Sequence, residues 1–219
     1  MPSTLVHVGV ALLLASALLG DHLDWRAIAI VIAVTVFPDI DTFIGLWLME
    51  GGHRTVLHNI VFPLLALGIV AWDVRWREES WIRRRWGAYG VRVAWVSLLA
   101  GWLVAHVLLD AFYNGVNLFW PLYDQFIDLS GELYYSTHDG FVQTFVGFEW
   151  TANGVQFEEE HVRGGTDDTH YRTGVDLGPD ASSDDERIFP IAESGELFLI
   201  ALSGYLVTAV RLWETRSRT

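Results

Sequence analysis

The stretch Gly101–Pro121, GWLVAHVLLDAFYNGVNLFWP, decides how the rest of the chain is interpreted. It begins as an apolar run with helical character and ends among aromatic residues. Within it, His106 and Asp110 are four positions apart, which on an α-helix places both side chains on one face, about 6 Å apart. An ionisable pair inside an apolar run is costly and is by default a functional-site hypothesis. The pair therefore predicts a place where a metal ion can be held.

The composition separates an apolar portion of the chain from an acidic one. Hydrophobic residues make up 52% of the 219 residues, but the formal net charge is −13, and the mean hydropathy is +0.30. Residues 149–190 hold 11 carboxylates and 3 arginines, whereas the segments around them are nearly uncharged. A chain of this length can form one domain with a substantial core.

The charged and sulfur-containing residues exclude several classes of function. All 14 basic residues are arginine, and this acidic, lysine-free composition resembles that of proteins from extreme halophiles. The absence of cysteine excludes disulfides and thiolate metal ligands. Net acidity argues against nucleic acid as a partner, because the phosphate backbone would be repelled.

Five apolar runs are each close to the length of about 20 residues that a bilayer core requires. A soluble helical core is the alternative, but soluble helices rarely stay apolar on every face for this length. We therefore expect a mainly α, multi-pass membrane bundle of about five helices, with the lipid bilayer as its surroundings. The runs are Thr4–Gly20, Arg26–Met49, Val56–Asp73, Val91–Tyr113 and Ile191–Trp213.

The arginines predict an orientation for this bundle. Residues 75–92 hold six arginines, three of them consecutive at positions 83–85, so the positive-inside rule places this loop in the cytoplasm. Alternating the helices then places the N-terminus and residues 114–190 outside. The C-terminal tail falls inside, in agreement with Arg211, Arg216 and Arg218.

The chain divides into three parts. Residues 1–122 form the expected membrane core with the metal site, and residues 191–219 the last membrane helix and the tail. Residues 123–190 form an acidic extracytoplasmic insertion, where alternating runs such as Phe141–Phe148 and Gly154–Phe157 predict β-hairpins. We expect the insertion to be loose around residues 164–186, with His161 and His170 exposed. It is either a lid over the site or a salt-tolerant surface.

Polar residues from four separate segments converge, on this map, at the outer leaflet. Taken singly, each of these residues also has a purely structural interpretation. His106 and Asp110 could form a hydrogen bond between packed helices, and Pro38–Asp41, PDID, could be only a helix break. However, carboxylates in a membrane-embedded break are costly unless a positive group meets them. The candidate metal ligands are His7, Asp39, His53, His58, His106 and Asp110.

Imidazoles and carboxylates without sulfur suit Zn²⁺ or another first-row divalent ion such as Mn²⁺. A bound ion of this kind lowers the pKa of a coordinated water toward neutrality. The convergent residues therefore predict a hydrolytic metal site; the resemblance described next implies one or two ions.

Four blocks, in this order and spacing, resemble the YdjM-like family. They are His7, PDID at Pro38–Asp41, HRTVLH at His53–His58, and HVLLD followed by YNGVNLFWPL at residues 106–122. Members of that family are described as LexA-binding, inner-membrane-associated proteins and as membrane-bound metal-dependent hydrolases. The resemblance covers residues 1–122 and does not include the acidic insertion.

The YdjM-like family is in turn similar to zinc-dependent phospholipase C and the P1-type nucleases. This similarity implies an all-helical core in which Asp39, His58, His106 and Asp110 bind one metal ion. His7 would join a bridging Asp110 at a second ion. The further His and Glu ligands of the soluble enzymes have no clear match here, and His138 is the candidate replacement.

The leading hypothesis is a metal-dependent hydrolase of phosphate esters or lipid-like substrates at the outer membrane face. Asp39 or Asp41 would act as general base or position the water, and Arg54 would pair with phosphate oxygens. Aromatic residues would lie at the membrane interface and hold an acyl chain. They are Trp102, Phe112, Tyr113, Phe119 and Trp120.

A second hypothesis is a non-enzymatic membrane scaffold or regulator with a structural metal, whose partner would bind the cytoplasmic arginine loop. An ion transporter is disfavoured, because the polar residues cluster at one leaflet and do not cross the membrane. The sequence does not fix the oligomeric state, although glycines at positions 45, 68 and 101 permit close helix contacts.

Overall fold

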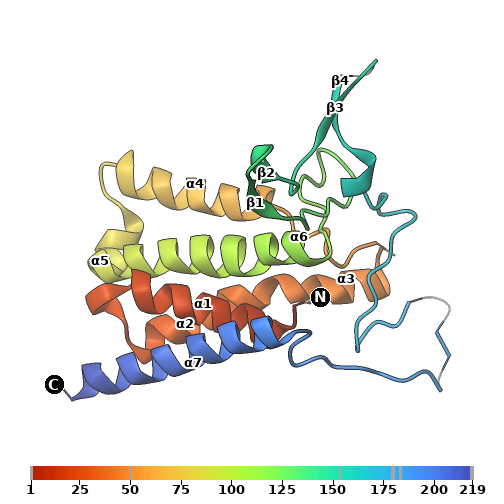
Figure 1. The fold of residues 1–219 in the computed structure, drawn as a ribbon. Coiled ribbons are helices and arrows are strands. Elements are labelled where there is room, and N and C mark those ends of the chain that lie inside the picture. Colours follow the sequence, from red (N-terminus) through yellow and green to blue (C-terminus); the bar gives the residue numbers. More distant parts are fainter. Residues whose placement is uncertain (1, 50, 153, 179–180, 183, 218–219) are drawn as a thin grey trace.

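The computed structural model describes residues 2–49, 51–152, 154–178, 181–182 and 184–217, and the chain is mainly helical. Arg218, part of the expected cytoplasmic tail, lies outside these ranges. The helices lie side by side with roughly aligned axes, and a strand-containing segment projects from one end (Figure 1). The predicted helical bundle with a small strand region is confirmed.

Each apolar run forms helix. The first run gives α1 (Thr4–Leu18), and the second gives α2 (Trp25–Val36), a 3-10 turn (Phe37–Ile40) and α3 (Asp41–Trp47). The third gives α4 (Val61–Arg75). The fourth gives α5 (Trp81–Val96), a π-helical segment (Ser97–Leu108) and α6 (Leu109–Tyr113), and the last gives α7 (Gly195–Arg216).

Side-chain caps fix where several of these helices begin. Ser3, Asp24, Ser80 and Ser194 each precede a helix and accept a hydrogen bond from a backbone N–H in its first turn. Such a cap satisfies one of the backbone donors that a helix N-terminus leaves free. These four polar residues therefore mark the positions at which the helices begin.

Within the described part of the chain, three helical stretches are by length and composition able to cross a membrane, namely residues 25–47, 81–113 and 195–216. The helices α1 and α4 have 15 residues each, fewer than the roughly 20 that a bilayer core requires. The apolar runs at these two places are longer than their helices, because the chain turns at Leu19 and because residues 51–60 form turns before α4. Of the five expected membrane spans, three are therefore long enough in the described structure to cross a bilayer.

The two charged segments lie at opposite ends of the bundle. The connection between α4 and α5 lies at one end with the C-terminus (Figure 1), and the consecutive arginines 83–85 follow it in the first turns of α5. The acidic insertion and the N-terminus lie at the other end. This arrangement is the one that the arginine distribution requires, although which end faces the cytoplasm stays a prediction.

The closest helix contact is between α1 and α7. A Cβ added at Gly204 would collide with the backbone carbonyl oxygen of Gly9, and a Cβ at Gly9 would lie 2.5 Å from the Cα of Ala201. Small residues therefore let the two backbones meet. Ser16 and Thr208 also share a hydrogen bond of 2.7 Å between these helices. The first and last helices of the chain are joined in this way.

The insertion contains two antiparallel hairpins, as predicted. The first pairs β1 (Leu133–Ser136) with β2 (Gly140–Gln143), and the second pairs β3 (Phe148–Thr151) with β4 (Gly154–Phe157). The expected run at residues 141–148 is thus divided between the two hairpins. No helix or strand occurs among the described residues between positions 164 and 186.

Three histidines of the insertion differ from expectation, and one of them, His170, is half-buried rather than exposed, with its Nε2 3.5 Å from Oδ2 of Asp176. His161 is buried rather than exposed, because its Nδ1 lies 2.9 Å from the backbone carbonyl of Asp128 and anchors the insertion internally. His138 is exposed in the turn between β1 and β2. It belongs to none of the groups of potential metal ligands in the described chain, so it does not replace the missing ligands.

Asp128 and Arg163 form an ion pair within the insertion, and this pair predicts that stability depends on pH. Burial alone would raise the pKa of Asp128, but hydrogen bonds from Arg163 and Ser130 outweigh it and hold the pKa below its usual range. A lowered folded-state pKa stabilises the protein above the unfolded value of about 3.9, and this stabilisation is lost as the pH falls through the folded-state pKa. We therefore expect Asp128→Asn to lower the unfolding temperature at pH 7 and to have a smaller effect at pH 3. An equal effect at both values would show that ionisation of Asp128 is not what stabilises the insertion.

Candidate metal centre

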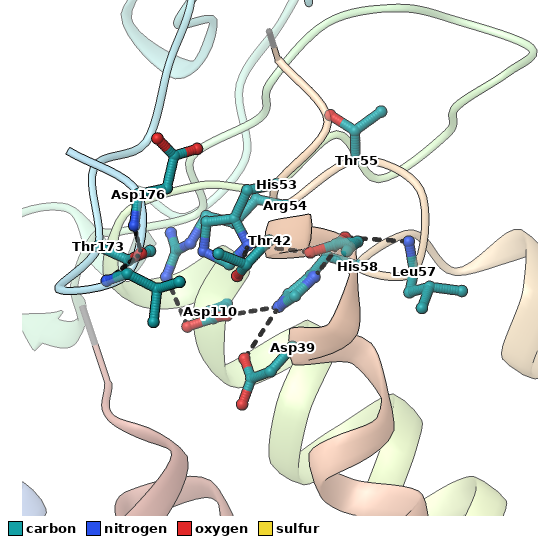
Figure 2. A network of polar contacts seen from close by, with 12 residues as sticks. Asp39, Thr42, His53, Arg54, Thr55, Leu57, His58, Asp110, Thr173 and Asp176 are labelled. Carbon is teal, nitrogen blue, oxygen red and sulfur yellow. Dashed lines mark hydrogen bonds and ion pairs between the residues drawn. The ribbon is translucent and has the colours of Figure 1, made fainter. Parts of the chain in front are cut away.

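Six predicted ligands from four segments lie close together, and Figure 2 shows Asp39, His53, His58 and Asp110 among them. Five of the six are almost completely buried, and only Asp39, with 26% of its side chain exposed, reaches the surface. Together with Asp41 they form three overlapping groups, and within each group the ligand atoms lie within 4.8 Å of one another. The groups are His7, His106 and Asp110; Asp39, His58 and His106; and Asp41, His53 and His58.

His106 and Asp110 lie where the π-helical segment passes into α6, not on a continuous α-helix as predicted. The wider turns of a π-helix are rare in proteins, and many of those that occur are at functional sites. The distance from Nε2 of His106 to Oδ2 of Asp110 is 4.0 Å. Gly101 lets α2 approach this segment, since a Cβ there would lie 2.7 Å from Oγ1 of Thr35. The carbonyl of Thr35 thereby reaches His106.

Four ligand atoms form a compact cluster. Nε2 of His106 lies 3.4 Å from Oδ1 of Asp39 and 2.9 Å from Nε2 of His58. Nε2 of His58 lies 3.8 Å from Oδ1 of Asp39 and 3.5 Å from Oδ2 of Asp110. In a tetrahedral zinc site with bonds of about 2.0–2.1 Å, ligand atoms are about 3.3–3.4 Å apart. The observed separations bracket this value.

The hydrogen bonds of the two central histidines determine their tautomers. Nδ1 of His106 lies 2.6 Å from the carbonyl of Thr35, and Nδ1 of His58 lies 2.8 Å from Oδ2 of Asp41. Both partners only accept hydrogen bonds, so each Nδ1 carries the proton. The two Nε2 atoms then direct lone pairs at each other across 2.9 Å. This contact is repulsive unless a cation or a shared proton lies between the two nitrogens.

His7 follows the same pattern at the edge of the cluster. Its Nδ1 lies 2.7 Å from the carbonyl of Ala105, and its Nε2 lies 3.4 Å from Oδ1 of Asp110. Its ring stacks on that of His106, with the centroids 4.0 Å apart. His7 is thus placed where the resemblance expects a ligand of a second ion.

Arg54 already occupies the neighbourhood of that second position. Its guanidinium donates to Oδ1 of Asp110 at 2.6 Å and to the carbonyl of Gly115 at 2.8 Å, and the side chain is completely buried. A second cation beside His7 would share Oδ1 of Asp110 with this guanidinium. The geometry therefore favours one ion in the cluster.

Asp41 lies behind the cluster and joins two histidines. Its Oδ2 accepts from Nδ1 of His58 and from the backbone N–H of Leu57, and its Oδ1 lies 2.9 Å from Nδ1 of His53. The carboxylate is fully buried. Partners of this kind orient a ligand histidine and raise its basicity. With both oxygens engaged, Asp41 positions His58.

Replacing Asp41 with asparagine is expected to weaken metal binding by about 10- to 100-fold, as is usual when an outer partner of a ligand histidine is lost. An amide can still accept one hydrogen bond, so the fold should survive. Competition with a fluorescent zinc chelator measures the affinity. Asp139→Asn in the exposed turn between β1 and β2 is the matched control. Equal affinities for wild type and Asp41→Asn would contradict this role.

His53 differs from the other histidines. Its Nδ1 lies 2.9 Å from Asp41 and 3.0 Å from Oγ1 of Thr42, while its buried Nε2 has no hydrogen-bond partner within the described part of the chain. No contact between this Nε2 and Asp39, His106 or Asp110 is within hydrogen-bond distance. His53 therefore stands beside the four-atom cluster, on the side of Asp41.

The insertion supplies residues that the sequence pattern did not indicate. The ring of Tyr171 covers Arg54 at 4.9 Å, and its hydroxyl donates to the carbonyl of Asn114 at 2.7 Å. Burial raises the pKa of Tyr171, so the phenol stays a neutral donor at physiological pH. A tyrosine in a loop of low periodicity gives no local signal of such a contact. The insertion thus covers Arg54 at the edge of the site.

A fourth group of potential ligands lies elsewhere, in the insertion. It consists of Glu158, Glu160 and His161, and Glu160 is exposed. Nδ1 of His161 lies 2.9 Å from a carbonyl oxygen, and its Nε2 is 3.8 Å from Glu160. Exposed acidic groups of this kind commonly occur without a metal ion, and this group has no part in the cluster around His106.

The donor set at the main cluster fits a divalent cation. Nitrogen and oxygen atoms converge, the carboxylates balance the charge of an ion, and the histidine tautomers leave Nε2 free to coordinate.

In a comparison with known protein families, residues 1–162 match the YdjM inner membrane protein family. No match was found among the curated proteins or among the solved structures. A match over almost three quarters of the sequence shows that this chain belongs to the YdjM inner membrane protein family.

Proposed function

We propose that this protein is a membrane-bound, metal-dependent hydrolase of phosphate esters. The observation that carries the proposal is the approach of Nε2 of His58 to Nε2 of His106, 2.9 Å apart and within reach of two carboxylates. Such an arrangement is favourable around a cation. A catalytic metal site keeps a coordination position for water, and we place that position beside Asp39, the ligand whose side chain reaches the surface.

In this proposal Asp39, His58, His106 and Asp110 hold one divalent ion, with zinc as the first choice and manganese as the second. When bound, the ion supplies Lewis-acid polarisation of a phosphoryl oxygen and an acidified water. Hydrolysis then adds one water across a P–O bond and yields an alcohol and a phosphate product. The orientation with this end of the bundle outside the cytoplasm is part of the proposal.

The protein's own residues have three tasks. The carbonyl groups of Thr35 and Ala105, together with Asp41, hold the histidine tautomers. Asp39 is the ligand next to the opening, where it also accepts a hydrogen bond from Oγ1 of Thr4 at 2.6 Å. Arg54 keeps Asp110 ionised and in place; because its guanidinium is enclosed, we assign it this positioning task in preference to direct phosphate binding.

The test is a substrate screen with the detergent-purified protein before and after metal removal. Phosphate diesters and monoesters, with and without long acyl chains, are incubated with native, chelated and zinc- or manganese-restored protein. We expect turnover that disappears on chelation and returns with the ion. Turnover that survives complete metal removal, with the metal content verified, would overturn the proposal.

A second function, a regulator with a structural metal, is favoured by the surface at the opposite end of the bundle. There, Arg83, Arg84 and Arg85 are exposed together with Trp81 and Trp86. Under this alternative, replacing the three arginines with glutamine would remove the cellular function while the metal ligands could be exchanged without effect. Under the hydrolase proposal the reverse is expected.

A further inference from the structure

A cavity of about 330 Å³ opens beside the metal-ligand cluster. Asp39 and His53 contribute to its polar side, so the cavity reaches the one cluster carboxylate that is accessible. Its volume is at the lower end of the range typical for small-molecule sites, about 300–1,000 Å³. The cavity can hold a headgroup and the first segment of a chain, but no complete diacyl lipid.

Three parts of the chain build this cavity. One wall is the N-terminus with Leu5, and a second is α3 with Phe43. The third wall is the final part of the insertion, residues 173–175 together with Phe189 and Pro190. Oγ of Ser3 donates to the carbonyl of Ile191 at 2.5 Å and ties the first wall to the third. The insertion therefore forms one wall of this cavity.

The apolar lining continues onto an exposed apolar surface. Leu5, Phe43 and Phe189 are exposed, although each also lines the cavity. Side chains on α3, just before it and ahead of α7 are exposed and apolar as well. They are Ile40, Leu46, Trp47, Ile188 and Ile191. In a membrane protein, such a surface at the end of the bundle contacts acyl chains rather than water.

The polar side of the cavity contains an acceptor without a partner. His53 lines the cavity, its Nδ1 is directed to Asp41, and its Nε2 is buried and makes no hydrogen bond to any residue that the structure describes. Because Nδ1 carries the proton, Nε2 accepts a hydrogen bond. Leaving a buried acceptor without a partner is unfavourable, and a ligand hydroxyl that donates to it would remove this cost.

From this combination we propose that the cavity binds a membrane phospholipid. Its phosphate ester lies toward Asp39, its acyl chain follows Leu5, Phe43 and Phe189 into the bilayer, and a headgroup hydroxyl donates to His53. This rests on the proposed function for the chemistry at the phosphate, but the binding itself does not require turnover. The aromatic residues expected from the sequence to hold the acyl chain do not line this cavity, and Trp102 is buried, with its Nε1 donating to the carbonyl of Leu57.

Photo-crosslinking tests the proposal. The full-length protein is reconstituted into liposomes that contain phosphatidylglycerol with a diazirine in its acyl chain, and the labelled peptides are identified by mass spectrometry. We expect labelled peptides that contain Leu5, Phe43 or Phe189. Dodecyl phosphate added to the wild type should suppress this labelling. Labelling confined to α4 and other lipid-facing helices, or no suppression by dodecyl phosphate, would overturn the proposal.

A matched pair of variants adds a second criterion. Val175→Trp fills the cavity, whereas Val155→Trp on β4 changes an equally exposed valine of the same insertion away from it. We expect labelling of the cavity peptides to fall at least about fivefold in Val175→Trp, because the indole displaces apolar contact area, and to stay unchanged in Val155→Trp. An equal response of both variants would contradict the assignment. Metal content is measured in parallel: normal labelling in a protein that binds no metal would refute the hydrolase proposal alone.

Discussion

Replacing Arg54 with alanine is expected to destabilise the protein by about 3–5 kcal/mol, because the change leaves the carboxylate of Asp110 buried without its cation. Arg54 is completely enclosed, and its guanidinium nitrogen lies 2.6 Å from Oδ1 of Asp110. The loss also frees the carbonyl of Gly115 and the face of Tyr171. The free energy of unfolding is measured by denaturant titration in mixed micelles, with chelator present so that no bound ion takes over the role of the arginine.

The chain offers a control with the same bond length in a different environment. Arg163 donates to Oδ2 of Asp128 at 2.6 Å, but 53% of its side chain is exposed. Solvent screens such a pair, so Arg163→Ala should cost about 1 kcal/mol or less. If the two substitutions destabilise the protein equally, burial of the Arg54–Asp110 pair is not what makes it important.

Replacing His106 with alanine is expected to abolish both metal binding and turnover. Nε2 of His106 is within 4.0 Å of ligand atoms on Asp39, His58 and Asp110, so it is the donor that the others share. Its removal also deprives His7 of its stacking partner. Phosphate-ester hydrolysis should fall to the background rate, and His138→Ala, in an exposed hairpin turn, should behave like the wild type.

Full activity of a metal-free His106→Ala protein would exclude the hydrolase mechanism. Loss of activity with retained metal would give a different answer, namely that His106 acts on the substrate and that the other donors hold the ion. A folding control by circular dichroism separates both results from unfolding.

The helices were predictable because apolar length is a local property of the sequence. All five apolar runs contain helices, and the hairpins follow from alternating residues around Gly140 and Gly154. The details that depend on contacts between segments were not predictable. One is the π-helical turn before Asp110. Another is the shortening of α1 and α4, which the chain turns at Leu19 and at residues 51–60 decide.

The convergence of these side chains was predictable, because ionisable side chains in apolar runs are rare and expensive; that they bind a metal ion stays a prediction. The different positions of these side chains in the site were not predictable. From the sequence alone, Asp39 and Asp41 are equivalent carboxylates, but in the fold one reaches the cavity while the other is sealed behind His58. Similarly, the role of Arg54 depends on the distant Asp110, and the cavity depends on Val175 and Phe189, which lie more than 130 residues after Asp39.

The most direct test of a metal centre at the end of this bundle is elemental analysis of the purified protein. The wild type is compared with the double variant His106→Ala/Asp110→Ala, each at equal protein concentration and after the same zinc or manganese supplementation. The account predicts about one ion per wild-type chain and almost none in the variant, because these two side chains supply half of a four-ligand site. A well-folded wild type without metal, or a variant that retains its ion, would contradict it.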